Sequence, residues 1–66
     1  MKTLIKLPEV VRRTAKSKGE IYKQMRRGIF PRPVKFGRRS VAWVEEEIDA
    51  YVAQKIAMRD DQKANQ

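Results

Sequence analysis

The amino-acid sequence predicts a small, mainly α domain with one β-hairpin, in the order α-α-β-β-α. Two segments with apolar residues at helical spacing come first, two β-prone segments then flank a short loop that contains glycine, and a longer helical segment follows. The chain has 66 residues, enough for one domain with a thin core and no enclosed cavity. We expect residues 1–58 to form this domain and residues 59–66 to be a polar, frayed tail.

The first helix is expected over residues 8–14. Leu7, Val10 and Val11 recur at helical spacing, and Pro8 stands at a first helical position, where its missing N–H costs no hydrogen bond. Residues 14–17 are long enough only for a turn to the next helix.

The second helix is expected to begin at Lys18. Ser17 followed three residues later by Glu20 is a capping-box pattern, in which the serine oxygen accepts a hydrogen bond from a first-turn N–H. Gly28 and the prolines after it should end the helix near Arg27. The apolar stripe of this helix is expected to consist of Ile21, Met25 and Ile29.

The second half of the chain predicts a hairpin and a third helix. Residues 34–36 and 40–43 are β-prone and flank Gly37, Arg38 and Arg39. The helix is expected from Val44, with carboxylates in its first turn, where they interact favourably with the helix dipole. Two short helices, a hairpin and a helix make a winged helix-turn-helix fold. The core is expected to include Phe36, Trp43, Val44, Ile48 and Tyr51.

Positive charge is concentrated in the first part of the chain. Residues 1–40 carry 13 Lys and Arg side chains against two carboxylates, whereas residues 41–66 carry three against six, for a formal net charge of +8. A positive potential confined to one part of a small domain indicates a polyanion-binding face.

Composition argues against an enzyme. The chain has no cysteine and no histidine, which removes thiolate metal sites and the usual general base, so we expect no catalytic residue, cofactor or metal. No apolar run approaches the roughly 20 residues of a membrane span, so we expect a soluble, cytoplasmic protein.

The candidate DNA contacts lie on the second helix and the hairpin loop. With Ile21 toward the core, Gly19, Lys23 and Arg27 fall on the opposite side and Arg26 flanks them, which suits the major groove. The arginines of the hairpin loop suit an adjacent minor groove. The candidate DNA-binding residues are Ser17, Lys18, Gly19, Tyr22, Lys23, Arg26, Arg27, Lys35, Arg38, Arg39 and Ser40.

Several motifs occur in a fixed order along the chain: LPEV at 7–10, S-x-x-x-IY at 17–22, RRG-x-FP at 26–31, P-x-K-x-G-R at 33–38 and AW at 42–43. In these motifs the sequence resembles the AlpA family of phage regulatory proteins. The resemblance implies a protein of phage or mobile-element origin that binds double-stranded DNA through its second helix and wing. It also implies transcriptional regulation of an integrase, or service as a recombination directionality factor (excisionase) with an integrase as partner.

The sequence departs from the family pattern in two places. The family usually has Gly-Leu where Ala15 and Lys16 stand, and Ser or Thr where Gly19 stands.

Because one recognition helix contacts only a few base pairs, we expect a monomer in solution that acts as several copies side by side on DNA.

Two other functions fit the composition. A basic RNA-binding protein would prefer RNA to duplex DNA, although exposed stacking aromatics are not evident in the sequence. A protein-interaction adaptor for an integrase would use the acidic third helix.

Overall fold

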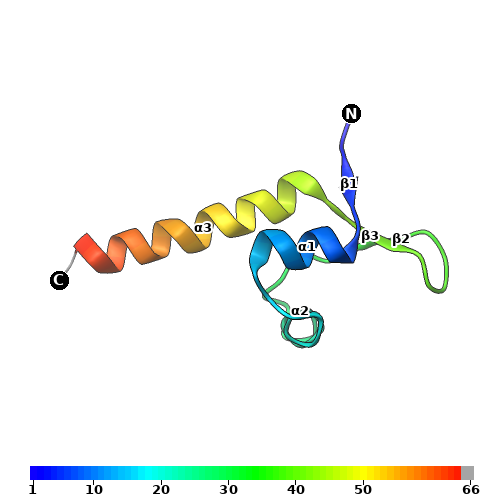
Figure 1. The fold of residues 1–66 in the computed structure, drawn as a ribbon, viewed down its shortest axis with the longest axis horizontal. Helices are drawn as coiled ribbons and strands as arrows, with labels where there is room; N and C mark the ends of the chain where they lie inside the picture. Colours follow the sequence, from blue (N-terminus) through cyan, green and yellow to red (C-terminus); the bar gives the residue numbers. More distant parts are fainter. Residues whose placement is uncertain (65–66) are drawn as a thin grey trace.

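A computed structural model describes residues 1–64 of the chain, with side chains up to Asp61. Three helices pack beside a small sheet (Figure 1). The predicted mainly α architecture with a β-hairpin is confirmed, with one short strand added at the start. The elements are β1 (Leu4–Ile5), α1 (Leu7–Thr14), α2 (Lys18–Arg26), β2 (Val34–Lys35), β3 (Val41–Val44) and α3 (Glu45–Ala64).

The sheet is antiparallel, with strand order β1-β3-β2. Val34 pairs with Ala42 across the predicted hairpin, and Ile5 pairs with Trp43 on the other side of β3. The N–H of Glu45 donates to the Thr3 carbonyl at 2.8 Å, which extends the β1 pairing into the start of α3. We did not expect β1, because two residues are too few for an alternating pattern to be recognised.

The turn between α1 and α2 confirms the predicted cap. Ser17 Oγ accepts a hydrogen bond from the Glu20 N–H at 3.2 Å and so satisfies a free donor at the start of α2. On the other side of the turn, Ala15 ends α1 in the left-handed region, with φ 56° and ψ 24°. Its N–H donates to the Val11 carbonyl at 2.9 Å.

The core lies where the three helices meet β3. Trp43 and Ile48 are fully buried at its centre, and the indole Nε1–H of Trp43 donates to the Pro31 carbonyl at 3.1 Å. This hydrogen bond ties the loop after α2 to the sheet. The buried cluster consists of Ile5, Val10, Ile21, Phe30, Trp43, Ile48 and Tyr51.

Two residues expected in the core are exposed. Ile29 is 55% exposed because α2 ends at Arg26 and Gly28 takes a φ of +75°, so the helical spacing is broken before Ile29 and the next residue, Phe30, is buried instead. Phe36 is 60% exposed because β2 ends at Lys35 and the hairpin extends away from the helices (Figure 1).

Helix α3 is longer than expected. We predicted fraying beyond Met58, but the helix continues to Ala64 and extends beyond α1 (Figure 1). The physical reason is composition, since Arg, Gln, Lys and Ala in this segment all favour helix. Residues 65–66 of the expected tail lie outside the described residues.

Candidate nucleic-acid interface

Helix α2 has one buried side and one cationic exposed side. Ile21 is fully buried, while Lys18, Lys23 and Arg26 are exposed along the helix, as is Arg27 at its end. Gly19 lies on the exposed side, and a Cβ built there meets no atom within 4 Å. The surface around Gly19 is therefore open to a close approach by another molecule.

The start of α2 carries the candidate Ser17 and the acidic residue Glu20. Ser17 is exposed, but its side-chain oxygen already accepts the capping hydrogen bond. The Glu20 carboxylate lies 3.8 Å from Lys16 Nζ, so the acidic residue of this face is paired with a lysine of the turn. The Glu20 carboxylate therefore does not neutralise the cations farther along α2.

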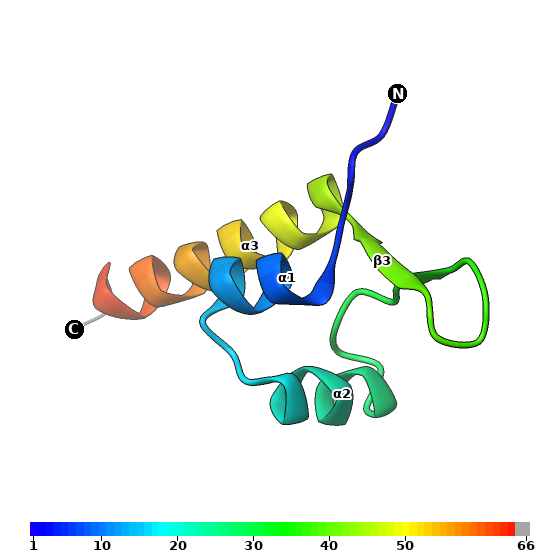
Figure 2. The same ribbon diagram turned by 45° about the vertical axis from the view of Figure 1, so that its right-hand side comes forward.

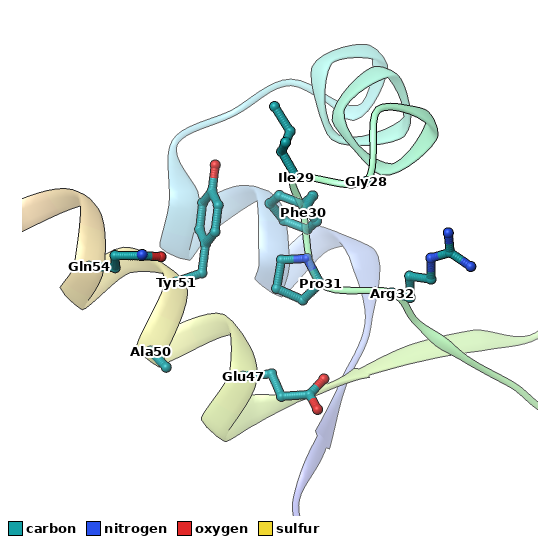
Figure 3. Close-up of a pocket in the computed structure, with 9 residues that line it drawn as sticks. All are labelled: Gly28, Ile29, Phe30, Pro31, Arg32, Glu47, Ala50, Tyr51 and Gln54. Atoms are coloured by element: carbon teal, nitrogen blue, oxygen red, sulfur yellow. The ribbon is translucent and has the colours of Figure 1, made fainter.

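Aromatic side chains position α2 against the rest of the molecule. The Tyr51 hydroxyl on α3 donates to Gln24 Oε1 on α2 at 2.9 Å. The Tyr51 ring meets Phe30 edge to face, with ring centroids 4.8 Å apart. Figure 3 shows both rings in the open hollow between α3 and the loop that follows α2. These contacts fix the end of α2 relative to α3.

The β2–β3 hairpin, residues 34–44, forms a wing. The Phe36 N–H donates to the Ser40 carbonyl at 2.7 Å and closes the loop. Lys35, Arg38, Arg39 and Ser40 are all exposed on it. In both ribbon views α2 lies at the bottom of the molecule and the wing loop projects to the right (Figures 1 and 2).

A groove of about 440 Å³ joins α2 to the wing. Tyr22 and Arg26 line it from α2, and Lys35 lines it from β2. Three of the candidate residues are thus brought together from two elements, whereas Arg38 and Arg39 lie farther out in the wing loop. The groove also contains Arg32, which the sequence analysis missed. The only feature of the sequence that points to Arg32 is that this cation stands between two prolines.

The arginines of α1 belong to a different surface. Arg13 is bonded to Glu9 at 2.7 Å, to Glu45 at 2.9 Å and to Asp49 at 3.1 Å, and Arg12 Nε is 2.9 Å from Glu9 Oε1. Hydrogen bonds from Arg12 and Arg13 lower the pKa of Glu9 to about 2, and the hydrogen bonds that Arg13 donates to Glu9 and Glu45 raise the pKa of Arg13. These arginines are neutralised within the fold.

The cations of α2, the following loop and the wing have no such partners. None of them forms a salt bridge with a carboxylate in the described part of the chain. The carboxylates that would neutralise them are engaged elsewhere or lie on α3. We call this set the unpaired cations: Lys18, Lys23, Arg26, Arg27, Arg32, Lys35, Arg38 and Arg39.

Residues 1–64 contain neither a membrane-spanning helix nor a cluster of metal ligands. No helix there combines the length and the apolar character needed to cross a membrane. Nor does this part of the chain place three or more acidic side chains where they would surround a metal ion.

Comparisons with known proteins give a consistent match. The sequence model of the family described as "Prophage CP4-57 regulatory protein (AlpA)" matches residues 3–56. The chain is also 38% identical over 55 residues to the uncharacterized protein ORF88 of Enterobacteria phage P4, which covers 83% of this chain and 62% of that protein. The chain thus spans less than two thirds of this relative's length. No solved structure matches significantly.

Proposed function

The chain belongs to the AlpA family of prophage regulatory proteins, and from this premise we propose that it binds double-stranded DNA through α2 and the wing. The observation that carries the proposal is the segregation of charge. The arginines of α1 are paired with carboxylates, whereas the unpaired cations gather on α2, the loop after it and the wing. A duplex offers a dense array of phosphates to such a surface.

In the proposed complex α2 lies in the major groove. Lys23 and Arg26 project from the side of α2 opposite Ile21 and reach base edges, and Gly19 allows close approach to the duplex. Lys18 and the hydroxyl of Tyr22 contact flanking phosphates.

The remaining contacts come from the loop and the wing. Arg32 and Lys35, across the groove from Arg26, bind the phosphates between the two DNA grooves. Arg38 and Arg39 at the end of the wing enter the adjacent minor groove. This arrangement contacts a few base pairs per molecule, so several copies side by side would be needed for specific action.

The salt dependence of binding tests the electrostatic part. Removing one phosphate contact should reduce the slope of log K against log[salt] by about 0.9. We expect this for Lys18→Ala and Arg32→Ala, which remove proposed phosphate contacts, measured by fluorescence anisotropy on a labelled duplex. Arg59→Ala is the matched control, because it removes the same charge from the exposed outer part of α3, where Arg59 pairs with Asp60. Equal slopes for all three variants would contradict the proposed face.

The regulatory role needs a second experiment. We propose that the protein regulates transcription of an integrase, acts as a recombination directionality factor, or does both. Selection of bound fragments of the host genome should recover repeated sites beside an integrase attachment region for a directionality factor, and sites over a promoter for a regulator. Stronger binding to RNA than to any duplex would replace DNA with RNA as the ligand. An adaptor would give two results together. The wild type would enrich no DNA, and the double variant Arg38→Ala/Arg39→Ala would still capture an integrase.

A further inference from the structure

Phe36 is an aromatic residue with no place in the core. It is 60% exposed, whereas Phe30, Trp43 and Tyr51 are all buried. Leaving a phenylalanine in water forgoes the free energy that its burial would supply, and the fold gains no packing from it in return. Apart from Met1, no large apolar side chain in the described part of the chain is more exposed.

The position of Phe36 is fixed by the wing backbone. Its N–H donates to the Ser40 carbonyl at 2.7 Å, so it stands where the paired strands give way to the loop. The preceding residue, Lys35, lines the groove next to α2. Phe36 therefore begins the part of the wing that carries Arg38 and Arg39 beyond that groove.

The surroundings of Phe36 define the chemistry of its partner. No carboxylate occurs between residues 21 and 44, and Lys35, Arg38 and Arg39 are all unpaired cations. An apolar protein surface placed here would have to desolvate three cations without compensation. A DNA minor groove instead offers phosphates on both sides and, between them, base steps that admit an apolar side chain.

We propose that Phe36 is a wedge that enters the minor groove at a base step and bends the duplex, while Arg38 and Arg39 enter the same groove beside it and contact its phosphates. This inference rests on the proposed DNA binding. The cost of unstacking one step is offset by burial of the phenylalanine ring and by the added contact of a bent duplex with the wing. A flexible pyrimidine–purine step is the expected site, because it unstacks most easily.

The test compares Phe36→Ala with Phe36→Leu on a duplex carrying one selected site and a dye at each end. For the wild type we expect a bend of at least roughly 20°, seen as energy transfer between the dyes. Phe36→Ala should abolish the bend and weaken binding roughly tenfold, and its salt slope should equal that of the wild type because an apolar side chain releases no counterions. Phe36→Leu should retain most of the bend. Val34→Ala, which shortens another exposed apolar side chain of the wing, is the matched control. It should change neither the bend nor the affinity.

Each contrary result has a separate meaning. An unchanged bend and affinity for Phe36→Ala would overturn the wedge, as would a wild-type complex that leaves the duplex straight. If Phe36→Ala binds a single site normally and loses only cooperative binding to two adjoining sites, Phe36 contacts a neighbouring copy and the wedge is again wrong. Failure of the wild type to bind any duplex would remove the proposed function itself, and the binding step detects this before bending is measured.

Discussion

Ala15 adopts a backbone conformation that ordinarily belongs to glycine. Its φ of 56° and ψ of 24° place it in the left-handed region, where a Cβ costs roughly 1–2 kcal/mol. It is the one non-glycine residue with a positive φ in the described part of the chain. The strain allows α1 to end in a turn tight enough for Ser17 to cap α2 two residues later.

Replacing Ala15 with glycine should stabilise the protein. Ala15→Gly removes the strain but adds freedom to the unfolded chain, so the free energy of unfolding should rise by about 0.5–1 kcal/mol, measured by urea denaturation. The control Ala57→Gly, within α3, should lower it by about 1 kcal/mol, since glycine there is in an ordinary helix. A variant at position 15 no more stable than the wild type would show that the turn is unstrained.

At the level of single residues, sequence reasoning succeeded where local patterns decide the outcome. Ser17 as a cap and Ile21 as the buried side of α2 both follow from spacing. Ile29 and Phe36 were assigned to the core but are exposed. Each was placed in the core by the residue spacing of a helix or strand that ends just before it. Arg32 was missed because its place in the groove depends on how the loop packs, which no spacing shows.

A cluster of ion pairs joins α1 to α3. Arg13 of α1 is shared among Glu9 on the same helix and Glu45 and Asp49 at the start of α3. Its side chain is 24% exposed and that of Glu9 is 31% exposed, so the Arg13–Glu9 pair is partly shielded from water. The cluster holds the two helices together at the end of the molecule where β1 meets α3.

This cluster makes the stability of the fold depend on pH in the acid range. The pKa of Glu9 falls from 4.5 to about 2 on folding, so its stabilising effect is complete above pH 4.5 and is lost as the pH falls toward 2. Glu9→Gln should therefore unfold at a lower temperature than the wild type at neutral pH, with the gap narrowing below pH 4.5. Thermal unfolding followed by circular dichroism measures this gap.

The matched control for this variant is Glu47→Gln, an exposed carboxylate that forms no salt bridge within residues 1–61. Its pH dependence should follow that of the wild type. A gap between Glu9→Gln and the wild type that stays constant down to pH 2 would show that Glu9 does not lose a stabilising charge in acid.

Most elements were predictable because each has its own local signal. Helical spacing, a serine cap and a glycine-containing loop between β-prone segments predicted α1, α2 and the hairpin. Strand β1 has no such signal, because Leu4–Ile5 becomes a strand only by pairing with β3. The length of α3 was underestimated because residues 59–64 are polar and were expected to fray, although these residues favour helix.

Across the whole molecule, charge is divided between a neutralised region and a cationic region. The carboxylates of α1 and of the start of α3 pair with Lys2, Arg12 and Arg13. Of the unpaired cations, Arg26, Arg32 and Lys35 line the groove between α2 and the wing, where they repel one another in the absence of a ligand. The excess of positive charge was visible in the sequence, but its division between paired and unpaired arginines was not, because it depends on contacts between distant segments.

This repulsion should make the free protein more stable in moderate salt. Raising NaCl from about 20 mM to about 200 mM shortens the screening length to below about 10 Å and weakens the repulsion among the unpaired cations. We expect Tm to rise by a few degrees, and to rise less for the double variant Arg38→Gln/Arg39→Gln. Calorimetry measures both. A fall in Tm with salt would mean that the ion pairs of α1 and α3 outweigh the repulsion.

The burial of Trp43 makes the core observable on its own. It is the chain's single tryptophan, it is fully buried, and its indole N–H is bonded to the Pro31 carbonyl. Intrinsic fluorescence excited at the indole band therefore comes from one site, which joins the sheet to the loop after α2. A ligand on the exposed side of α2 or on the wing loop does not touch this ring, whereas unfolding exposes it to water. Its emission can thus follow the melting of the core while a ligand is bound.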